Sequence, residues 1–201
     1  MNRIIGSYSS ITAAIMVFLF AISLITGILP LSYIASFIFS WTYLLMTCAF
    51  YVRAPKERRV AALAGTAFAC VYVALIGLVY FTQLTAVMHQ TESVDVVLSL
   101  TFSPGRWFFF IDLLGYAFLS LSVFFAALSL APKSKADRWL KGLMLVHGIY
   151  APACIILPML NVFRTDAPGG DMAGVIALLF WCVHFVPIAV LSALHMSKSN
   201  C

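Results

Sequence analysis

The chain alternates long apolar runs with short polar segments, and this pattern predicts six membrane-spanning helices. A helix that crosses about 30 Å of hydrocarbon needs about 20 mostly apolar residues, because each residue advances the helix by about 1.5 Å. Runs of this length cover roughly residues 10–28, 33–52, 60–84, 106–130, 139–162 and 173–196. We therefore predict an all-α integral membrane protein in which residues 1–201 form a single six-helix transmembrane bundle.

Two irregularities interrupt this pattern. Residues 85–105 form the only long connection, and its apolar part, Val94 to Leu100, is too short to cross a membrane. We expect this part to lie at the membrane interface or to re-enter the outer end of the bundle. Pro152 and Pro158 fall inside the fifth run, where we expect them to kink the helix.

Composition supports a membrane protein and excludes a soluble domain. Of the 201 residues, 63% are hydrophobic and 9% are charged, and the mean hydropathy is +1.04. Soluble domains contain about 25% charged residues, so this chain has too few to cover a surface in water. The five cysteines have neither CxxC nor zinc-type spacing, so we expect no disulfide framework, no metal and no cofactor.

The positions of lysine and arginine predict the orientation of the bundle. Basic loops follow the second run (RAPKERR) and the fourth run (residues 132–141). With both ends in the cytoplasm, 10 of the 12 Lys and Arg lie inside, all except Arg106 and Arg164. Cytoplasmic loops are enriched in these residues, so we predict an N-in, C-in topology. Because the net charge of +5 comes from such loops, the lipid bilayer is an expected partner and nucleic acid is not.

One acidic residue, Asp112, lies about two turns inside an apolar run. A carboxylate at this depth costs about 2.5–3.5 kcal/mol on insertion scales, so such residues usually face the bundle interior and carry function. At about 100° per residue, Asp112 shares a helix face with Gly115 and Tyr116, whereas Phe110 and Leu114 lie opposite. The sequence is equally consistent with an Asp that joins helices by hydrogen bonds and with one that serves a ligand, proton or substrate.

Several other polar and aromatic residues fall on helix faces that can converge with Asp112. Tyr80 and Gln83 follow one stripe of the third run, and His184 shares a face with Trp181 in the last run. If these faces meet, they form a polar, aromatic pocket that opens to the outside. The candidate ligand-binding residues are Tyr80, Gln83, Arg106, Asp112, Tyr116, His147, Asn161, Trp181 and His184.

These residues also have structural interpretations. His147 and His184 are suited to hydrogen bonds between helices, and Arg106 is suited to anchoring a helix at the membrane interface. A bis-histidine haem site, or a zinc site that adds Asp112, would use the right residue types, but the sequence lacks a diagnostic ligand spacing for either.

The strings YFTQL (Tyr80 to Leu84) and FFIDLLGYAF (Phe109 to Phe118), together with the RAPKERR loop, resemble a group of bacterial multi-pass inner-membrane proteins without known activity. The resemblance implies a bacterial cytoplasmic membrane and says nothing about chemistry. From the residues, we predict a protein that binds or moves a small apolar or amphipathic molecule, such as a lipid, isoprenoid or quinone. The alternatives are a membrane-embedded cyclase, isomerase or hydrolase with Asp112 as acid or base, and a structural subunit of a homo- or hetero-oligomer.

Overall fold

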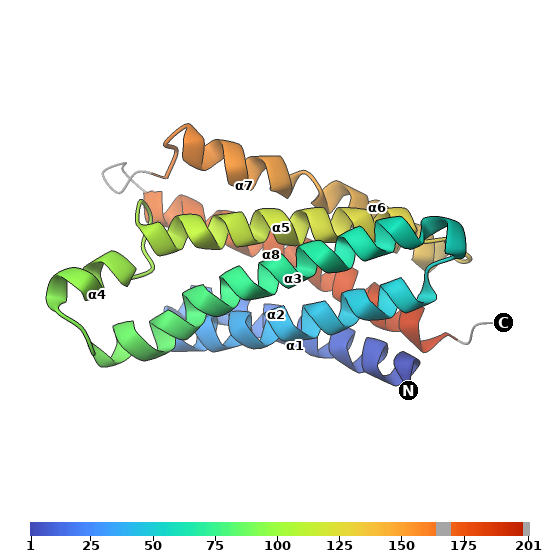
Figure 1. The fold of residues 1–201 in the computed structure, drawn as a ribbon, viewed down its shortest axis with the longest axis horizontal. Helices are drawn as coiled ribbons and strands as arrows, with labels where there is room; N and C mark the ends of the chain where they lie inside the picture. The colour runs from blue at the N-terminus through green and yellow to red at the C-terminus, as the bar shows by residue number, and fades with distance from the viewer. Residues whose placement is uncertain (164–169, 199–201) are drawn as a thin grey trace.

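The protein is a bundle of long helices packed side by side (Figure 1). The computed structural model describes residues 1–163 and 170–198, and these contain no strand. Six spans are long and apolar enough to cross a membrane, which confirms the predicted all-helical, multi-pass architecture. The elements are α1 (Asn2–Thr26), α2 (Leu29–Arg53), η1 (Lys56–Arg58), α3 (Arg59–Thr82), η2 (Gln83–Val87), α4 (Val94–Leu100), α5 (Trp107–Ser129), α6 (Lys135–His147), α7 (Tyr150–Met159) and α8 (Gly170–Ser197).

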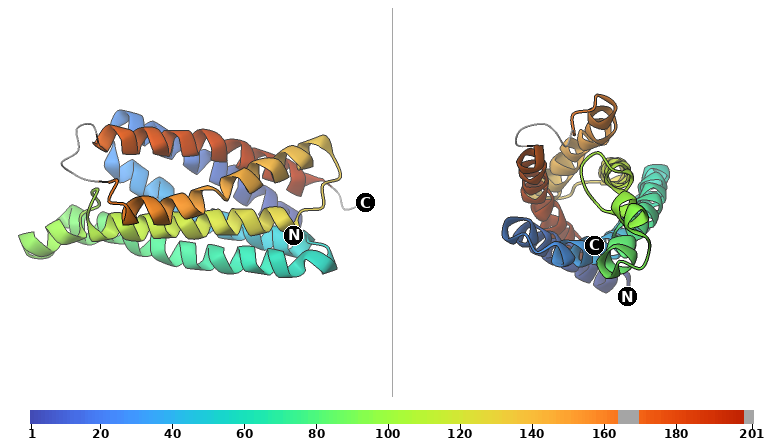
Figure 2. Two further views of the ribbon diagram at one scale, coloured as in Figure 1. Left: turned by 90° about the horizontal axis from the view of Figure 1, so that it is seen from above. Right: turned by 90° about the vertical axis from the view of Figure 1, so that its left-hand side faces the viewer.

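The helices are arranged in a ring, and neighbours in the ring are mostly neighbours in the sequence (Figure 2). The helix α1 packs on α2, α2 on α3, and α3 on α5. The helix α6 packs on both α5 and α8, and α8 returns to α1 and closes the ring. The helix α7 packs mainly on α5 and contacts α8 near its start, through Tyr150 and His184, whereas its far end diverges from α8.

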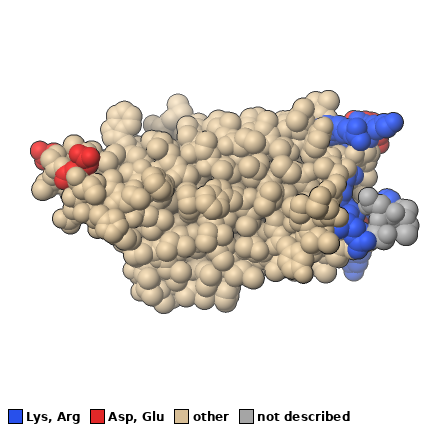
Figure 3. Space-filling model, turned by 60° about the horizontal axis from the view of Figure 1, so that its bottom comes forward, with Lys and Arg blue, Asp and Glu red and all other residues tan. Residues whose placement is uncertain are grey.

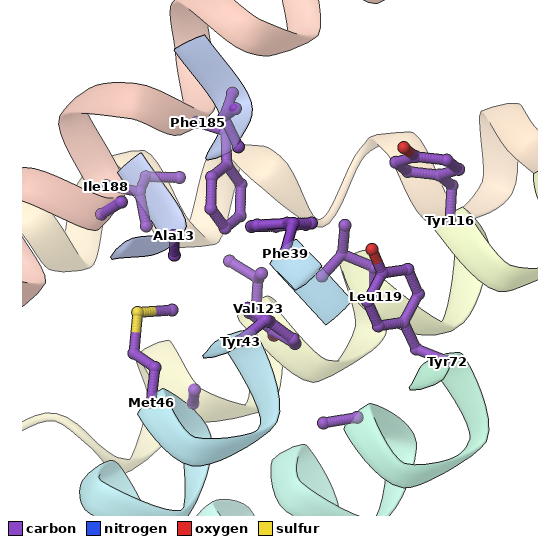
Figure 4. Packing of buried hydrophobic residues seen from close by; sticks show 14 of the residues in the cluster. Ala13, Phe39, Tyr43, Met46, Tyr72, Tyr116, Leu119, Val123, Phe185 and Ile188 are labelled. Atoms are coloured by element: carbon purple, nitrogen blue, oxygen red, sulfur yellow. The ribbon is translucent and has the colours of Figure 1, made fainter. Parts of the chain in front are cut away.

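The interior of the ring is filled by apolar side chains, among them several large aromatic rings (Figure 4). Phe39 contacts Phe185 nearly perpendicularly, with 5.1 Å between ring centroids. Tyr43 is fully buried and donates a hydrogen bond of 2.7 Å to Ser122 Oγ, which in turn donates one of 2.6 Å to the carbonyl of Gly65. This relay joins α2, α5 and α3 where α3 and α5 approach closely: a Cβ on Gly65 would lie 3.0 Å from the Ser122 carbonyl oxygen.

The first helix begins at Asn2, earlier than the predicted start near residue 10. The polar residues at its start fit a helix in the bundle because their side chains bond to helix backbone. The Ser10 hydroxyl donates to the Gly6 carbonyl at 2.7 Å within the same helix. The Arg3 guanidinium donates to the Ser197 carbonyl at the end of α8, which ties the two ends of the chain together.

The fifth predicted helix is two helices, α6 and α7, with the break between His147 and Tyr150. The amides of Gly148 and Ile149 bond to carbonyls three residues earlier, so the last turn of α6 tightens. Pro152 lies just beyond and lacks the N–H needed to continue the regular ladder. The break is therefore sharper than the expected kink and precedes Pro152, and Pro158 lies inside α7.

The two ends of the bundle differ in charge (Figure 3). Lys and Arg gather at the end where α1 begins and α8 finishes, and several of them bond to helix C-termini. Arg58 and Lys141 both donate to the carbonyl of Leu130 after α5, and Arg53 donates to that of Met196 in α8. Cations at these positions are stabilised by the helix dipole. Arg164 lies outside the described residues.

Candidate ligand-binding site

A cavity of about 280 Å³ lies between α5, α7 and α8. The helix α5 contributes one wall, the divergent helix α7 the second, and the first half of α8 the third. Its lining is almost entirely apolar, and Asp112 is its one acidic side chain among the described residues. The lining residues are Phe102, Phe109, Asp112, Leu113, Tyr116, Ser120, Tyr150, Ala153, Cys154, Leu157, Phe163, Gly174, Ala177, Leu178 and Trp181.

The cavity has a buried floor and an exposed rim. Asp112, Tyr116 and Trp181 are 4%, 6% and 5% exposed, and they form the floor. Leu157 of α7 and Ala177 of α8 also line the cavity, yet both are exposed on the outside of the bundle. The described residues of α7 and α8 are not closely packed at this level, so we infer that the cavity opens sideways between them. The predicted opening toward the aqueous outside stays a prediction.

The carboxyl group of Asp112 is buried, and one of its two oxygen atoms, Oδ1, has no hydrogen-bond partner among the described residues. Its polar neighbour is the hydroxyl of Tyr80, which also interacts with the hydroxyl of Tyr116. Within the described part of the chain, no Lys, Arg or His forms an ion pair with Asp112. A buried acceptor in this state costs free energy unless something in the cavity donates to it.

Aromatic rings line the same cavity as the carboxyl group. Tyr116 and Trp181 meet edge to face, with 5.2 Å between ring centroids and an interplanar angle of 85°. Phe109 lies 5.7 Å from Phe102 and 5.2 Å from Phe163, centroid to centroid. These rings come from α5, α8 and the segments that flank α5 and α7, so the folded bundle is needed to bring them together.

The two histidines hold the junction of α6 and α7 against α8. His147 is fully buried, and its Nε2 accepts a hydrogen bond of 3.0 Å from the indole N–H of Trp181. His184 Nε2 lies 3.1 Å from the carbonyl oxygen of Leu143, which can only accept, so this nitrogen carries the proton. The other ring nitrogen of His184 then accepts from the hydroxyl of Tyr150 at 3.3 Å.

These contacts use both ring nitrogens of His184 and the Nε2 of His147, whose Nδ1 has no hydrogen-bond partner in the described part of the chain. Neither histidine belongs to the cavity wall, although His147 touches it through Trp181. The described residues contain no group of three or more His, Cys, Asp or Glu side chains placed to hold a metal ion. The histidines therefore act here as hydrogen-bonding residues between helices.

The structure brings some of the predicted residues together and separates others. Asp112, Tyr116 and Trp181 line the cavity, and Tyr80 bonds to Asp112 from behind this wall. Three more lie away from the cavity wall: Gln83, Arg106 and Asn161.

These three residues occupy other places in the fold. The Gln83 amide donates to Leu100 O at 2.8 Å and accepts from the Phe102 amide at 2.9 Å, which holds the end of α4. Arg106 precedes α5 and donates to the Leu98 carbonyl. Asn161 is exposed, with φ of 54°, in the turn after α7.

Sequence reasoning missed several apolar members of the site, notably Phe102, Phe109 and Ala177. No polar signal distinguishes them from other membrane-facing residues. Cys154 was recognisable in principle, since it lies on the same face of the fifth run as His147. No family model, curated protein or solved structure matches the chain. The interpretation of the site therefore depends on its own geometry.

Proposed function

We propose that the protein binds a small amphipathic molecule from the surrounding lipid in the cavity between α5, α7 and α8. The observation that carries this proposal is the unpartnered Oδ1 of Asp112 on the floor of an otherwise apolar cavity. Ligand sites are commonly apolar pockets with a few polar groups that fix the orientation of the ligand. A molecule with a polar head and an apolar body would satisfy both the carboxyl group and the aromatic walls.

The size of the cavity limits what enters it completely. An apolar cavity of about 150 Å³ holds one benzene molecule, and the cavity here is about 280 Å³. A single ring with a short chain fits this volume. A longer molecule would place its head or ring on the floor and extend its chain between Leu157 and Ala177 into the lipid. The sideways opening supports uptake from the membrane.

Binding is better supported than catalysis. General acid–base catalysis usually employs groups with separated proton affinities that both reach the reacting molecule. Asp112 is the only acid in the cavity wall among the described residues, and its hydrogen-bonding neighbour is a tyrosine. His147 and His184 are not part of the cavity lining, and their ring nitrogens bond to Trp181, Tyr150 and Leu143, apart from the unpartnered Nδ1 of His147.

The proposal includes an orientation. Both ends of the chain lie in the cytoplasm of a bacterial cell, the cavity lies in the outer half of the cytoplasmic membrane, and α4 lies at the outer interface. The clustering of Lys and Arg at one end supports this orientation. The short helix α4 projects from the opposite end, and Val94, Val96 and Leu98 are exposed there.

Cysteine labelling in intact cells tests the orientation. In a background without the native cysteines, Glu92→Cys is expected to react with an impermeant thiol reagent. Ser134→Cys, at the opposite end, is expected to react only after permeabilisation. Labelling of Ser134→Cys in intact cells would reverse the orientation and place the cavity in the inner half.

Filling the cavity tests binding. Ala177→Phe adds a ring at the rim of the cavity, whereas Val183→Phe adds a ring on the same helix at a side chain that is 73% exposed and outside the cavity. Native mass spectrometry of protein purified from its own membrane is expected to detect a bound molecule in the wild type and in Val183→Phe. Ala177→Phe is expected to lack it. Equal occupancy of all three proteins would contradict the cavity as the binding site.

A further inference from the structure

We propose that the polar head of this ligand is a protonated amine. The inference rests on the proposed function and specifies the chemistry that the floor of the cavity recognises. Three observations lead to it: among the described residues no cation pairs with Asp112, aromatic rings line the same cavity, and Asp137, the other acid buried in the described part of the chain, is fully paired.

The other buried acid, Asp137 in α6, is fully paired. It is 2% exposed, and its Oδ1 lies 2.9 Å from both Lys198 Nζ and His195 Nδ1. Its Oδ2 accepts hydrogen bonds from the backbone amides of Lys133 and Ser134. The fold thus supplies one buried carboxyl group with cations and amide donors.

Among the described residues, Asp112 receives no such partners, although it is also buried and lies deeper in an apolar span. The nearest cation in the sequence, Arg106, uses its guanidinium to bond to the Leu98 carbonyl. A buried carboxylate without a counter-ion is strongly destabilising. Ionisable residues in membrane spans commonly pair with a charge on a ligand. A cationic ligand would supply both the missing charge and the missing donor to Oδ1.

The walls around Asp112 suit a cation as well. A positive charge is attracted to the face of an aromatic ring within about 6 Å of the centroid, and this attraction strengthens when water is excluded. Tyr116, Trp181 and Phe109 line the same cavity as the carboxyl group. An ammonium head at Oδ1 would therefore lie among electron-rich rings, and its apolar body would fill the remaining space toward α7.

Other heads satisfy the site less well. A neutral alcohol would donate to Oδ1 without supplying a counter-ion, and a quinone carbonyl offers only acceptors. A carboxylate or phosphate would place a second negative charge beside the first. The expected order of affinity for matched molecules is amine, then alcohol, then acid.

Three probes of similar size test this order: 4-phenylbutylamine, 4-phenylbutan-1-ol and 4-phenylbutanoate. Trp181 reports binding by fluorescence, in a background with Trp41→Phe, Trp107→Phe and Trp139→Phe. These three tryptophans are 50%, 77% and 62% exposed and lie outside the cavity, so their replacement leaves its lining unchanged. The protein is purified in a maltoside, because an amine-oxide detergent would compete.

The amine is expected to bind at least tenfold more tightly than the alcohol, a factor that corresponds to about 1.4 kcal/mol. Asp112→Asn keeps the shape of the side chain and removes its charge, so it is expected to bring the two probes within about twofold of each other. Gel filtration and circular dichroism check that this variant is folded. A second variant, Tyr116→Phe, retains the charge and the ring and is expected to keep the preference for the amine.

The outcomes separate this inference from the proposed function. Equal binding of amine and alcohol, or a preference for the amine that survives Asp112→Asn, would overturn the amine head. Binding by either probe that Ala177→Phe abolishes would still support the cavity. If none of the probes changes the fluorescence of Trp181, both the cavity proposal and the amine head are contradicted.

Discussion

The close approach of α3 and α5 at Gly65 gives a sharp prediction about stability. A Cβ at this position would lie 3.0 Å from the carbonyl oxygen of Ser122 and 3.1 Å from the amide nitrogen of Ala126. Both atoms belong to the backbone in the last third of α5, so they cannot turn aside as a side chain can. Gly65→Ala therefore requires the two helices to separate or to tilt.

The expected change in the stability of Gly65→Ala is the balance between an unfavourable packing effect and a favourable effect of alanine on the helix. Contacts at 3.0–3.1 Å are tighter than ordinary van der Waals contact, so the helices must move by a few tenths of an ångström. Overpacking of this kind costs about 1–3 kcal/mol. The separation would also stretch the 2.6 Å hydrogen bond from Ser122 Oγ to the Gly65 carbonyl. Replacing Gly by Ala inside a helix stabilises the helix by up to about 1 kcal/mol, which offsets part of this cost.

Gly77 on the same helix provides the matched control. A Cβ there would meet only one atom within 4 Å, Phe37 Cε2 at 3.9 Å. We expect Gly77→Ala to be neutral or slightly stabilising, and Gly65→Ala to unfold with a free energy about 2 kcal/mol lower than Gly77→Ala. For a chain of this size, that difference corresponds to a Tm lower by roughly 4–8 °C.

Thermal unfolding in one detergent, followed by intrinsic fluorescence, measures the difference. If Gly65→Ala melts at the same temperature as Gly77→Ala, the two helices are not in rigid backbone contact at Gly65, and the reasoning fails. A Gly65→Ala protein that is more stable than the wild type would contradict it more strongly.

Three further predictions concern hydrogen bonds. Tyr43→Phe removes a buried donor to Ser122 and should lower the free energy of unfolding by about 1 kcal/mol. Tyr72→Phe, the control, removes a buried hydroxyl without a partner among the described residues and should be neutral or stabilising. Equal thermal stabilities of the two variants would contradict this prediction. Gln83→Leu breaks both hydrogen bonds that hold the end of α4, so hydrogen exchange of residues 94–102 should accelerate. Gln83→Glu keeps the acceptor for the Phe102 amide and should have a smaller effect. Unchanged exchange would show that α4 is held by other contacts. Ser134→Ala removes the capping box of α6 and should cost about 1 kcal/mol, measured by thermal unfolding against Ser99→Ala on the exposed side of α4; equal losses in the two variants would contradict a capping role.

Much of the fold could be predicted because lipid imposes strict requirements on a chain. Apolar length determines where spans lie, and helical periodicity determines which side of each span is buried. The predicted face of α5 is buried at Asp112 and Tyr116, whereas Phe110 and Leu114 on the opposite side are exposed. The polar stripe of the third run, which includes Gly65 and Tyr80, is buried as well.

The break between α6 and α7 was harder to locate. A proline cannot donate a hydrogen bond to the carbonyl one turn before it, so Pro152 disturbs the backbone near Gly148. Pro158, by contrast, lies inside α7, which stays helical around it. The sequence marks both prolines and does not indicate which of them interrupts the helix. That depends on neighbouring helices, such as the contact that a Cβ at Gly148 would make with Phe124.

The site could be predicted only in part, for a related reason. Periodicity assigns a residue to a face of its own helix, but the partner across the bundle depends on helix rotation and tilt. His184 bonds to a backbone carbonyl, that of Leu143, which no residue type reveals. Gln83 lies on the predicted buried face and yet serves α4 instead of the cavity. The apolar lining residues resemble every other membrane-span residue until the helices are assembled.

The buried serines of the first two helices have a consequence for biosynthesis. Ser10, Ser23, Ser32 and Ser40 are enclosed by the bundle, yet each hydroxyl donates to a carbonyl of its own helix. Such a helix carries its polar groups into lipid already satisfied, so α1 and α2 can leave the translocation machinery and reside in the bilayer before the rest of the chain is made. The Asp112 and His147 side chains have no such partner within their own helices. Helices that are already in the membrane therefore favour the insertion of these segments most.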